Sequence, residues 1–535
     1  MNRFLQRHLW FVLLLLSFYK GYGQAGQENS LKRPNILFCI ADDASIQHMS
    51  AYGYGLTKWV NTPGFDQIAK EGLLFTRAYT PNAKCAPSRS AVLTGRNPWQ
   101  LEAAGNHNPV YPAKFTTFME AFTKNGYHVG FTGKGWAPGN PGMVNGNPRL
   151  LTGPRYNNLQ TRAAVKGISE VDYTANFEAF LKENTTNKPF CFWFGSQEPH
   201  RAYEYGSGIT KGQKKISDIE SVPPFWIDNE TVRNDMLDYA FEVEYFDNQL
   251  IKMLKVLETN GELENTIIVV TSDNGMPFPR VKGHVYEHDN HLPLAIMWKA
   301  GIVSPGRVID DFVSFIDFAP TFFEAAAIDP LSANMQPFQG KSMIPIITSK
   351  SGTQIVPEND HVLLGRERQD VGRPQDEGYP VRAIVEGNYF YSINYEPNRW
   401  PSGNPETGYL DTDGSPTKTQ ILSANRKGEY QNLWQLSFGK KGSEELYQIN
   451  KDPYSMKNLA DDPEFAKIKD RLKKRMEQEL RDQVDPRMMN NGKVFDNYPY
   501  GEPKVIKFYE RYINGEKIPT PWVNPSDYEK RDFKP

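Results

Sequence analysis

A cysteine followed by turn-forming residues and two arginines is the part of this sequence with the clearest chemical potential. Residues 85–96 read Cys-Ala-Pro-Ser-Arg-Ser-Ala-Val-Leu-Thr-Gly-Arg. Pro87 suits the first position of a helix, and the hydroxyl of Ser88 can cap its free amides. A helix that begins here presents amide donors and positive partial charge, which favour an anion. Arg89 and Arg96 would add forked donors suited to a tetrahedral oxyanion.

Pairs of polar residues follow apolar runs elsewhere in the chain. Asp42 and Asp43 follow the run 35–40, and Asp273 and Asn274 follow a later one. Such runs are typical of strands buried on both faces of a parallel sheet, whose carboxyl ends hold ligands. Taken singly, each pair could be a solvated turn or a cap. Together, three carboxylates and an amide oxygen make a hard oxygen site for calcium or magnesium, and no paired Cys or His ligands indicate zinc.

The whole run 85–96 resembles the signature of the type I sulfatase family, Cys-x-Pro-Ser-Arg-x-x-x-Leu-Thr-Gly-Arg, at every fixed position. The resemblance covers most of residues 33–480. It implies that Cys85 is oxidised after synthesis to formylglycine, the nucleophile, by a formylglycine-generating or anaerobic sulfatase-maturing enzyme. It also implies that one calcium ion (Ca²⁺) is bound by residue 85 together with Asp42, Asp43, Asp273 and Asn274.

The same resemblance implies further catalytic residues. Family members use a lysine after a glycine, a histidine after a proline, and a lysine downstream of Asp-Asn. The matches in this chain are Lys134, His200 and Lys282. The metal, Arg89 and the two lysines would hold the sulfate oxygens, and His200 would protonate the leaving oxygen.

The residues expected to contact the sugar carry weaker signals. Many family members have a histidine two residues after the central lysine, where this chain has Trp136. His107 is a candidate to supply the missing donor. His288, His291 and Arg382 are further candidates for holding sugar hydroxyls or a neighbouring carboxylate, although each could equally be a surface residue.

The segment 272–279, Ser-Asp-Asn-Gly-Met-Pro-Phe-Pro, looks most like the N-sulfoglucosamine sulfohydrolase (sulfamidase) branch of the family. Exported relatives in glycan-degrading bacteria also remove O-sulfate from algal polysaccharides such as ulvan. We therefore expect a sulfated oligosaccharide substrate that carries either an O-sulfate or an N-sulfate. The loops 136–160, 201–232 and 284–291 are expected to close the cleft into a pocket, which favours sulfate on a terminal sugar.

Two other functions are compatible with parts of this pattern. One is a phosphohydrolase of the alkaline-phosphatase superfamily, but such enzymes use Ser or Thr where this chain has Cys85, and several histidine ligands that it lacks. The other is a catalytically inactive glycan-binding relative, which the intact set of site residues disfavours.

Length, charge and export signals narrow the class of protein. The 535 residues suffice for two domains, and a net charge of -2 argues against nucleic acid as a partner. Two arginines precede an apolar run from Leu9 to Phe18, which is typical of a signal peptide at 1–24 and too short to span a membrane. We expect an exported protein, periplasmic or secreted, with no membrane span in the mature chain. With only three cysteines, disulfides should not hold the fold, and Cys39 and Cys191 are interpreted as inert core thiols.

Strand and helix patterns alternate through the first part of the chain, which predicts an α/β domain at 33–380. The resemblance makes its mostly parallel sheet, flanked by helices, alkaline-phosphatase-like. Residues 381–485 predict a smaller C-terminal antiparallel sheet with a packed helix, because a hairpin pattern at 381–395 precedes a helical apolar stripe. Residues 486–535, rich in Pro, Asn, Tyr and Lys, are expected to form an irregular tail.

Overall fold

The computed structural model describes residues 32–54, 59–531 and 533. The predicted signal peptide at 1–24 lies outside this part of the chain. Within it, no helix is both long enough and apolar enough to cross a membrane. The three cysteines are buried and free, in agreement with a fold that disulfides do not hold together.

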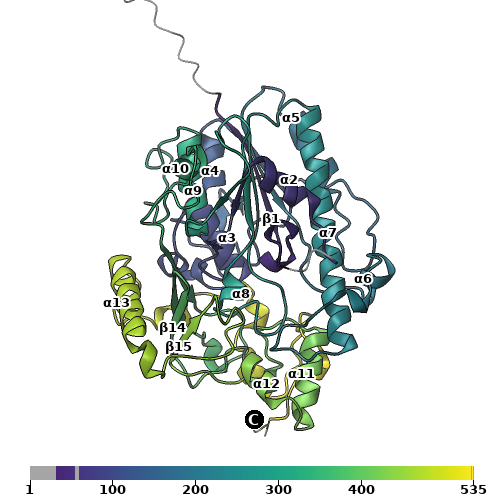
Figure 1. The fold of residues 1–535 in the computed structure, drawn as a ribbon, viewed down its shortest axis with the longest axis vertical. Coiled ribbons are helices and arrows are strands. Elements are labelled where there is room, and N and C mark those ends of the chain that lie inside the picture. The colour runs from purple at the N-terminus through teal and green to yellow at the C-terminus, as the bar shows by residue number, and fades with distance from the viewer. Residues whose placement is uncertain (1–31, 55–58, 532, 534–535) are drawn as a thin grey trace, which may run out of the picture.

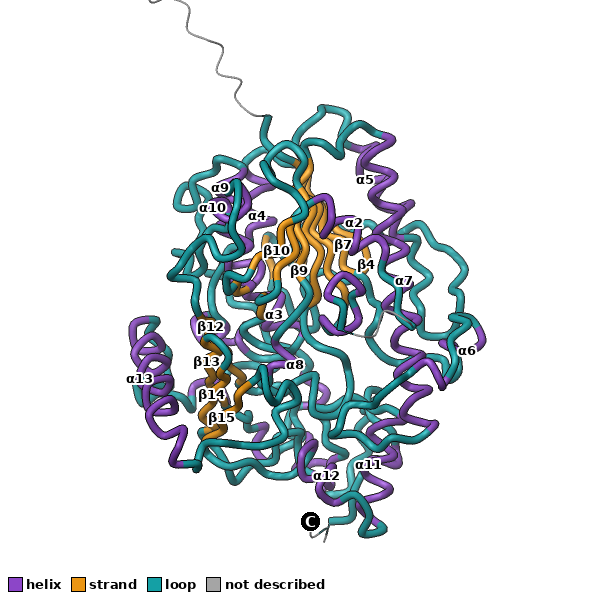
Figure 2. The backbone as a smooth tube through the Cα atoms, in the orientation of Figure 1, coloured by secondary structure: helices purple, strands orange, loops and turns teal. Residues whose placement is uncertain are grey.

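A seven-stranded sheet forms the centre of the larger domain, in the order β10-β2-β9-β8-β1-β7-β4 (Figure 2). Its strands are β1 (Asn35–Ala41), β2 (Leu73–Phe75), β4 (His128–Gly133), β7 (Phe190–Gly195), β8 (Thr266–Ser272), β9 (Leu294–Met297) and β10 (Arg307–Ile309). The neighbours β8, β1, β7 and β4 are parallel, with Phe38 opposite both Trp193 and Val269. Only β9 runs antiparallel to its neighbours β8 and β2 among these strands. The predicted mostly parallel α/β sheet is confirmed.

Helices cover both faces of this sheet, because alternate side chains of β1 point to opposite sides. Leu37 and Cys39 pack in one layer with α2 (Pro63–Glu71), α5 (Tyr173–Glu183) and α7 (Glu230–Thr259). Phe38 and Ile40 pack in the other with α3 (Cys85–Thr94), α4 (Phe118–Lys124) and α9 (Phe318–Ala325). Figure 1 shows the two groups of helices on either side of the sheet. Burial on both faces explains why β1 is apolar along its whole length.

A separate antiparallel sheet lies toward the C-terminal end of the molecule (Figure 1). Its strands are β12 (His361–Arg366), β13 (Val381–Glu386), β14 (Tyr389–Asn394) and β15 (Glu444–Gln448). Helix α13 (Ala466–Asp482) covers one face, and the other packs on Tyr79, Tyr286 and Phe312 of the larger domain. The predicted small sheet with its helix is confirmed. However, β12 pairs with β13, so the sheet begins before the predicted boundary at residue 380.

The sequence predicted an irregular tail at 486–535, but this part of the chain contains two short helices and packs against the rest of the molecule. It forms α14 (Val494–Asn497) and α15 (Phe508–Ile513) between short turns. Phe508 and Val523 share a small apolar core with Val371 and Leu410, which come from an earlier part of the chain. Further elements are α6 (Ser207–Thr210), α8 (Glu287–Asn290), α10 (Ile344–Thr348), α11 (Pro416–Arg426), α12 (Gln431–Ser437) and the short strands β3 (Ala78–Tyr79), β5 (Met143–Val144), β6 (Asn147–Pro148) and β11 (Val313–Ser314).

Candidate active site

The polar residues predicted to form one site come together at the carboxyl ends of the parallel strands. Strand β1 leads into Asp42 and Asp43, and β8 leads into Asp273 and Asn274. Parallel neighbours end at the same edge of a sheet, so these side chains meet there. The signature forms α3, whose first residue, Cys85, lies against the aspartates.

The Cys85 thiol is buried beside the paired aspartates. Its Sγ lies 3.6 Å from Asp42 Oδ1 and 4.0 Å from Asp43 Oδ1, and the residue is 2% exposed. Burial raises the pKa of this thiol, so it is uncharged at neutral pH. Since the thiolate is the reactive form of cysteine, an unmodified residue would be a poor nucleophile here.

Four residues form an acidic group that could hold a metal ion. Asp42, Asp43, Cys85 and Asp273 each place one ligand atom within 4.8 Å of the others. Asn274 donates its Nδ2–H to Asp43 Oδ1 at 2.7 Å, while its own buried Oδ1 has no partner among the described residues. A buried oxygen without a hydrogen bond points to a group that binds there. Carboxylate and amide oxygens together fit a hard divalent cation.

Each carboxylate of the acidic group is paired with a cation: Asp42 with Lys134 at 2.6 Å, Asp43 with Lys282 at 2.7 Å, and Asp273 with Arg89 at 2.8 Å. Burial raises the pKa of Asp42, but Lys134 and its other cationic neighbours hold that pKa well below its usual range. Burial raises the pKa of Asp273 to about 7 despite Arg89. The charges of these pairs balance, so a divalent cation would give the site the net positive charge that favours an oxyanion.

Arg89 lies beneath the site rather than at its surface. Its guanidinium is fully buried and donates through Nη1 to the carbonyls of Lys134 and Gly135, both at 3.0 Å. It does not line the cavity above Cys85. The predicted contact between Arg89 and the sulfate oxygens is therefore not supported by its position, which instead holds Lys134 in place.

Arg96 also lies away from the site, contrary to the prediction that it helps to bind an anion. Helix α3 ends at Gly95, which has a left-handed conformation with φ of 68° that favours glycine. The turn directs Arg96 to the carbonyl of Pro337, to which its guanidinium donates.

A cavity of about 340 Å³ opens above Cys85, and we call it the catalytic cavity. Its polar lining residues include Lys84, Cys85, His107, Lys134, His200, Lys282, Asp370 and Asp413. The Nδ1–H of His200 donates to the carbonyl of Arg201 at 2.6 Å, and Nε2 lies 3.8 Å from Asp43 Oδ2. Nε2 of His200 is therefore the nitrogen placed for proton transfer at this cavity.

Two carboxylates that the sequence did not single out also face the catalytic cavity. Asp413 pairs with Lys282 at 2.9 Å, and Asp370 lies 3.3 Å from Lys84 Nζ and 3.2 Å from His107 Nδ1. Lys84 and His107 hold the pKa of Asp370 below its usual range even though burial raises it. Neither aspartate belongs to a recognisable motif, so only the tertiary fold reveals them. His107 is the one predicted sugar-binding residue found at this cavity.

Trp136 and Arg382 do not reach the catalytic cavity. The indole N–H of Trp136 donates to Ser90 Oγ at 2.8 Å, so this side chain fastens the loop after β4 to α3. Arg382 is fully buried and paired with Glu367 and Asp485, each at 2.7 Å. A guanidinium held in this way has no access to a sugar, which contradicts the predicted role of Arg382.

His288 and His291 line a different, larger cavity. They belong to the loop 284–291, which the sequence predicted to help close the cleft. The segment between them and that pair turns so that Lys282 faces the catalytic cavity, while the neighbouring Val281 faces the larger one.

Comparisons with known proteins point to a single protein family. The Sulfatase family model matches residues 34–328. An ulvan-active sulfatase of Formosa agariphila is 27% identical over 453 residues, which cover 83% of this chain and 79% of that protein. The N-sulphoglucosamine sulphohydrolase of Homo sapiens is 24% identical, with 82% of this chain and 88% of that protein covered. A solved structure described as a complex with its substrate D-glucosamine-2-N,6-O-disulfate has a TM-score of 0.60 at 19% identity, covering 85% of this chain and 99% of that chain.

Proposed function

Because the chain belongs to the sulfatase family, we propose that it removes sulfate from sugars of oligosaccharides derived from sulfated polysaccharides. As a family member it is a sulfuric ester hydrolase. The observation that carries the proposal is a buried Cys85 among paired carboxylates and cations at the floor of a cavity. Relatives named for ulvan and for N-sulphoglucosamine support a glycan substrate with either an O-sulfate or an N-sulfate.

Residue 85 is proposed to act as formylglycine rather than as cysteine. The raised pKa of the buried thiol leaves an unmodified residue without its reactive thiolate form. Hydrated formylglycine supplies a hydroxyl nucleophile for sulfur and a second hydroxyl whose deprotonation releases sulfate. A formylglycine-generating or anaerobic sulfatase-maturing enzyme is therefore a proposed partner, with the signature 85–96 as its recognition segment.

Lys134 and Lys282 are proposed to bind the sulfate group. Both ammonium groups line the catalytic cavity. Lys134 is paired with one carboxylate, and Lys282 is paired with two. Each ammonium has three donors, so donors remain for the oxygens of an entering ester, where they offset developing negative charge. His200 at the same cavity would protonate the leaving oxygen through Nε2, and Asp43 lies close enough to stabilise the protonated ring.

The acidic group is proposed to bind one calcium ion. The ligands would be Asp42, Asp43, Asp273, the partnerless Oδ1 of Asn274 and residue 85. Bound calcium supplies Lewis-acid charge next to the nucleophile. Oxygen donors of this kind favour calcium or magnesium over zinc.

The shape of the catalytic cavity supports action on a terminal sugar. Its volume of about 340 Å³ lies at the small end of the range of roughly 300–1,000 Å³ seen for ligand pockets. Of the three loops expected to close it, only 136–160 contributes lining residues, Ala137 and Pro138. The C-terminal tail takes the place of the other two through Tyr500 and Trp522. We also propose export, on the signal-peptide pattern at 1–24.

A desulfation assay across a panel of sulfated oligosaccharides tests this function. Protein produced together with a maturing enzyme is loaded with calcium, and peptide mass spectrometry measures the fraction of residue 85 converted to the aldehyde. We expect sulfate release in proportion to that fraction, faster on short oligosaccharides than on the intact polymer at equal sulfate concentration.

Cys85→Ala, prepared in the same way, is the matched control and should show no turnover. Turnover by protein that carries only unmodified Cys85 would contradict the formylglycine proposal. If converted, calcium-loaded protein released no sulfate from any oligosaccharide but did cleave a small aryl sulfate, the glycan substrate would be wrong while the chemistry would stand.

A further inference from the structure

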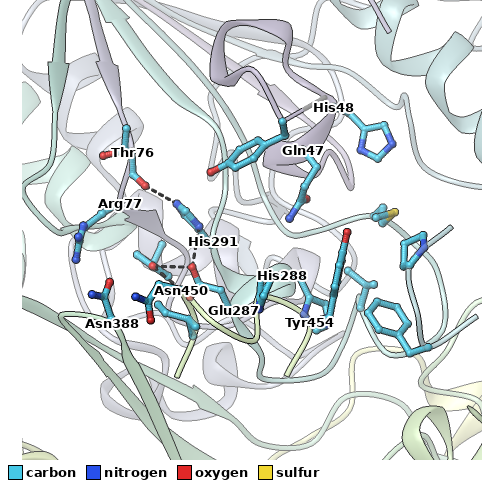
Figure 3. Close-up of a pocket in the computed structure, with 18 of the residues that line it drawn as sticks. Gln47, His48, Thr76, Arg77, Glu287, His288, His291, Asn388, Asn450 and Tyr454 are labelled. Atoms are coloured by element: carbon cyan, nitrogen blue, oxygen red, sulfur yellow. Dashed lines mark hydrogen bonds and ion pairs between the residues drawn. The ribbon is translucent and has the colours of Figure 1, made fainter. Parts of the chain in front are cut away.

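A second cavity, of about 480 Å³, shares none of its described lining residues with the catalytic cavity, and Figure 3 shows the side chains around it. We call it the lateral cavity. Val281 lines it, whereas the adjacent Lys282 lines the catalytic cavity, so one strip of chain separates the two. Its walls come from both domains: Phe225 and His288 belong to the larger one, and Asn388 lies in the turn of the small sheet.

His288 places an unused hydrogen-bond acceptor at the lateral cavity. Its ring is 3% exposed and stacks between Phe225 and Tyr286, with centroid distances of 5.1 and 5.6 Å. Nε2 lies 3.0 Å from the carbonyl of Arg280, so Nε2 carries the proton and Nδ1 has a free lone pair. Nδ1 is buried and has no partner among the described residues. A buried acceptor in this state favours a ligand that brings a donor.

Two further side chains at this cavity also have buried polar atoms without a hydrogen-bond partner among the described residues. His48 is 3% exposed, and neither of its ring nitrogens has a partner in the described part of the chain. Gln47 Oε1 is likewise buried and unpartnered. Both residues line the lateral cavity, and Figure 3 shows them above His288 and Tyr454, across the cavity from them. The walls of the lateral cavity therefore carry several polar atoms that no described protein group satisfies.

The charge of the walls indicates what kind of ligand fits. Among the described residues that line the lateral cavity, Arg77 is the only arginine or lysine, and it is already paired with Asp310 at 2.8 Å. Glu287 adds a carboxylate, which accepts from the hydroxyl of Tyr79 at 3.0 Å. A sulfated or carboxylated ligand would find no unpaired cation among the described lining residues, so an uncharged ligand is favoured.

The remaining chemistry of the walls matches a sugar. Tyr454 supplies an aromatic side chain on which the apolar face of a sugar ring can pack. Asn388 and Asn450 supply amides on the opposite side (Figure 3), where hydroxyl groups can both donate and accept. Hydroxyl donors also meet the need of His288 Nδ1 and Gln47 Oε1.

We propose that the lateral cavity is a second, non-catalytic saccharide-binding site, which takes an uncharged mono- or disaccharide unit. The site rests on its own lining residues and requires neither calcium nor formylglycine. Its test therefore has an outcome that is independent of sulfatase turnover.

Saturation-transfer difference NMR on the full-length protein tests this site with cellobiose, maltose and xylobiose as probes. At least one of these neutral disaccharides should bind. His288→Phe keeps the stacked ring but removes the acceptor, and should weaken binding by about tenfold. Asn450→Trp, at an exposed position of the rim, should block the site and abolish the signal. It keeps the test decisive if His288→Phe fails to fold.

The matched control is Asn491→Trp, an exposed asparagine that lines neither cavity, and it should bind as the unaltered protein does. Lys134→Ala, in the catalytic cavity, should also keep the signal. The proposal is overturned if no neutral disaccharide binds, or if the signal survives Asn450→Trp but disappears in Lys134→Ala. Binding of sulfated disaccharides alone would likewise overturn it, because the one cation among the described lining residues, Arg77, is already paired with Asp310.

Discussion

Replacing Arg89 by lysine keeps the positive charge but removes the forked guanidinium that holds the floor of the catalytic cavity. The guanidinium reaches Asp273 at 2.8 Å, the carbonyls of Lys134 and Gly135 at 3.0 Å each, and Asp42 at 3.3 Å. A lysine ammonium is a compact point charge and cannot span these four acceptors at once. We expect it to remain with Asp273 and to leave the carbonyl of Gly135 without a donor, whereas Lys134 still donates to both oxygens of Asp42.

The size of the effect follows from burial. Arg89 is fully buried, and each buried polar group that loses its partner costs about 1–3 kcal/mol. With one such group, the free energy of unfolding should fall by about 1–3 kcal/mol. The segment that carries Lys134 should shift, and a misplacement of about 1 Å can lower kcat by on the order of 100-fold.

Urea unfolding and steady-state kinetics on a small aryl sulfate measure the two effects in the calcium-loaded protein. Arg96→Lys is the matched control from the same helix, because Arg96 contacts only the carbonyl of Pro337 among the described residues. Its stability should stay within about 0.5 kcal/mol of the unaltered protein. If Arg89→Lys lost kcat but kept its stability to within the same margin, Arg89 would act on the substrate and our positioning role would be refuted.

Three further predictions concern the metal, the sugar and pH. Asp273→Asn should lower bound calcium, measured by elemental analysis, from about one ion per chain to almost none, because a carboxylate ligand is lost; undiminished calcium would refute the assigned ligand. Trp522→Ala should lower kcat/KM about tenfold on an oligosaccharide and far less on an aryl sulfate, because Trp522 lines the catalytic cavity. Equal losses on both substrates would place Trp522 at the reacting atoms. Burial lowers the pKa of His288 to about 3. Below about pH 6.5 this histidine is therefore protonated in the unfolded chain but not in the folded chain. The free energy of unfolding then falls as the pH falls from about 6.5 toward 3. His288→Phe should make the slope of unfolding free energy between about pH 6 and pH 4 shallower by about 1.4 kcal/mol per unit, and an unchanged slope would contradict this.

Local sequence patterns determined the elements and much of the acidic group. A strand buried on both faces must be apolar along its length, so β1 and β8 could be recognised, as could the polar pairs that follow them. Parallel neighbours must end at the same sheet edge, so Asp42 and Asp273 could be expected to meet. The signature predicted a helix but misplaced its start, because α3 begins at Cys85 rather than at Pro87 and no side chain caps it.

Only the tertiary structure decided which side of each element faces a cavity. Arg89 and Lys134 carry the same charge, yet one lies beneath the floor and the other lines the catalytic cavity. The tail beyond residue 485 closes that cavity, and its approach depends on apolar contacts with Val371 and Leu410, which lie far earlier in the chain. Lys282 and His288 lie only a few residues apart but line different cavities, because the chain at Val281 and Lys282 separates the two. Such facing is set by the packing of distant side chains, which periodicity and motifs along the chain do not encode.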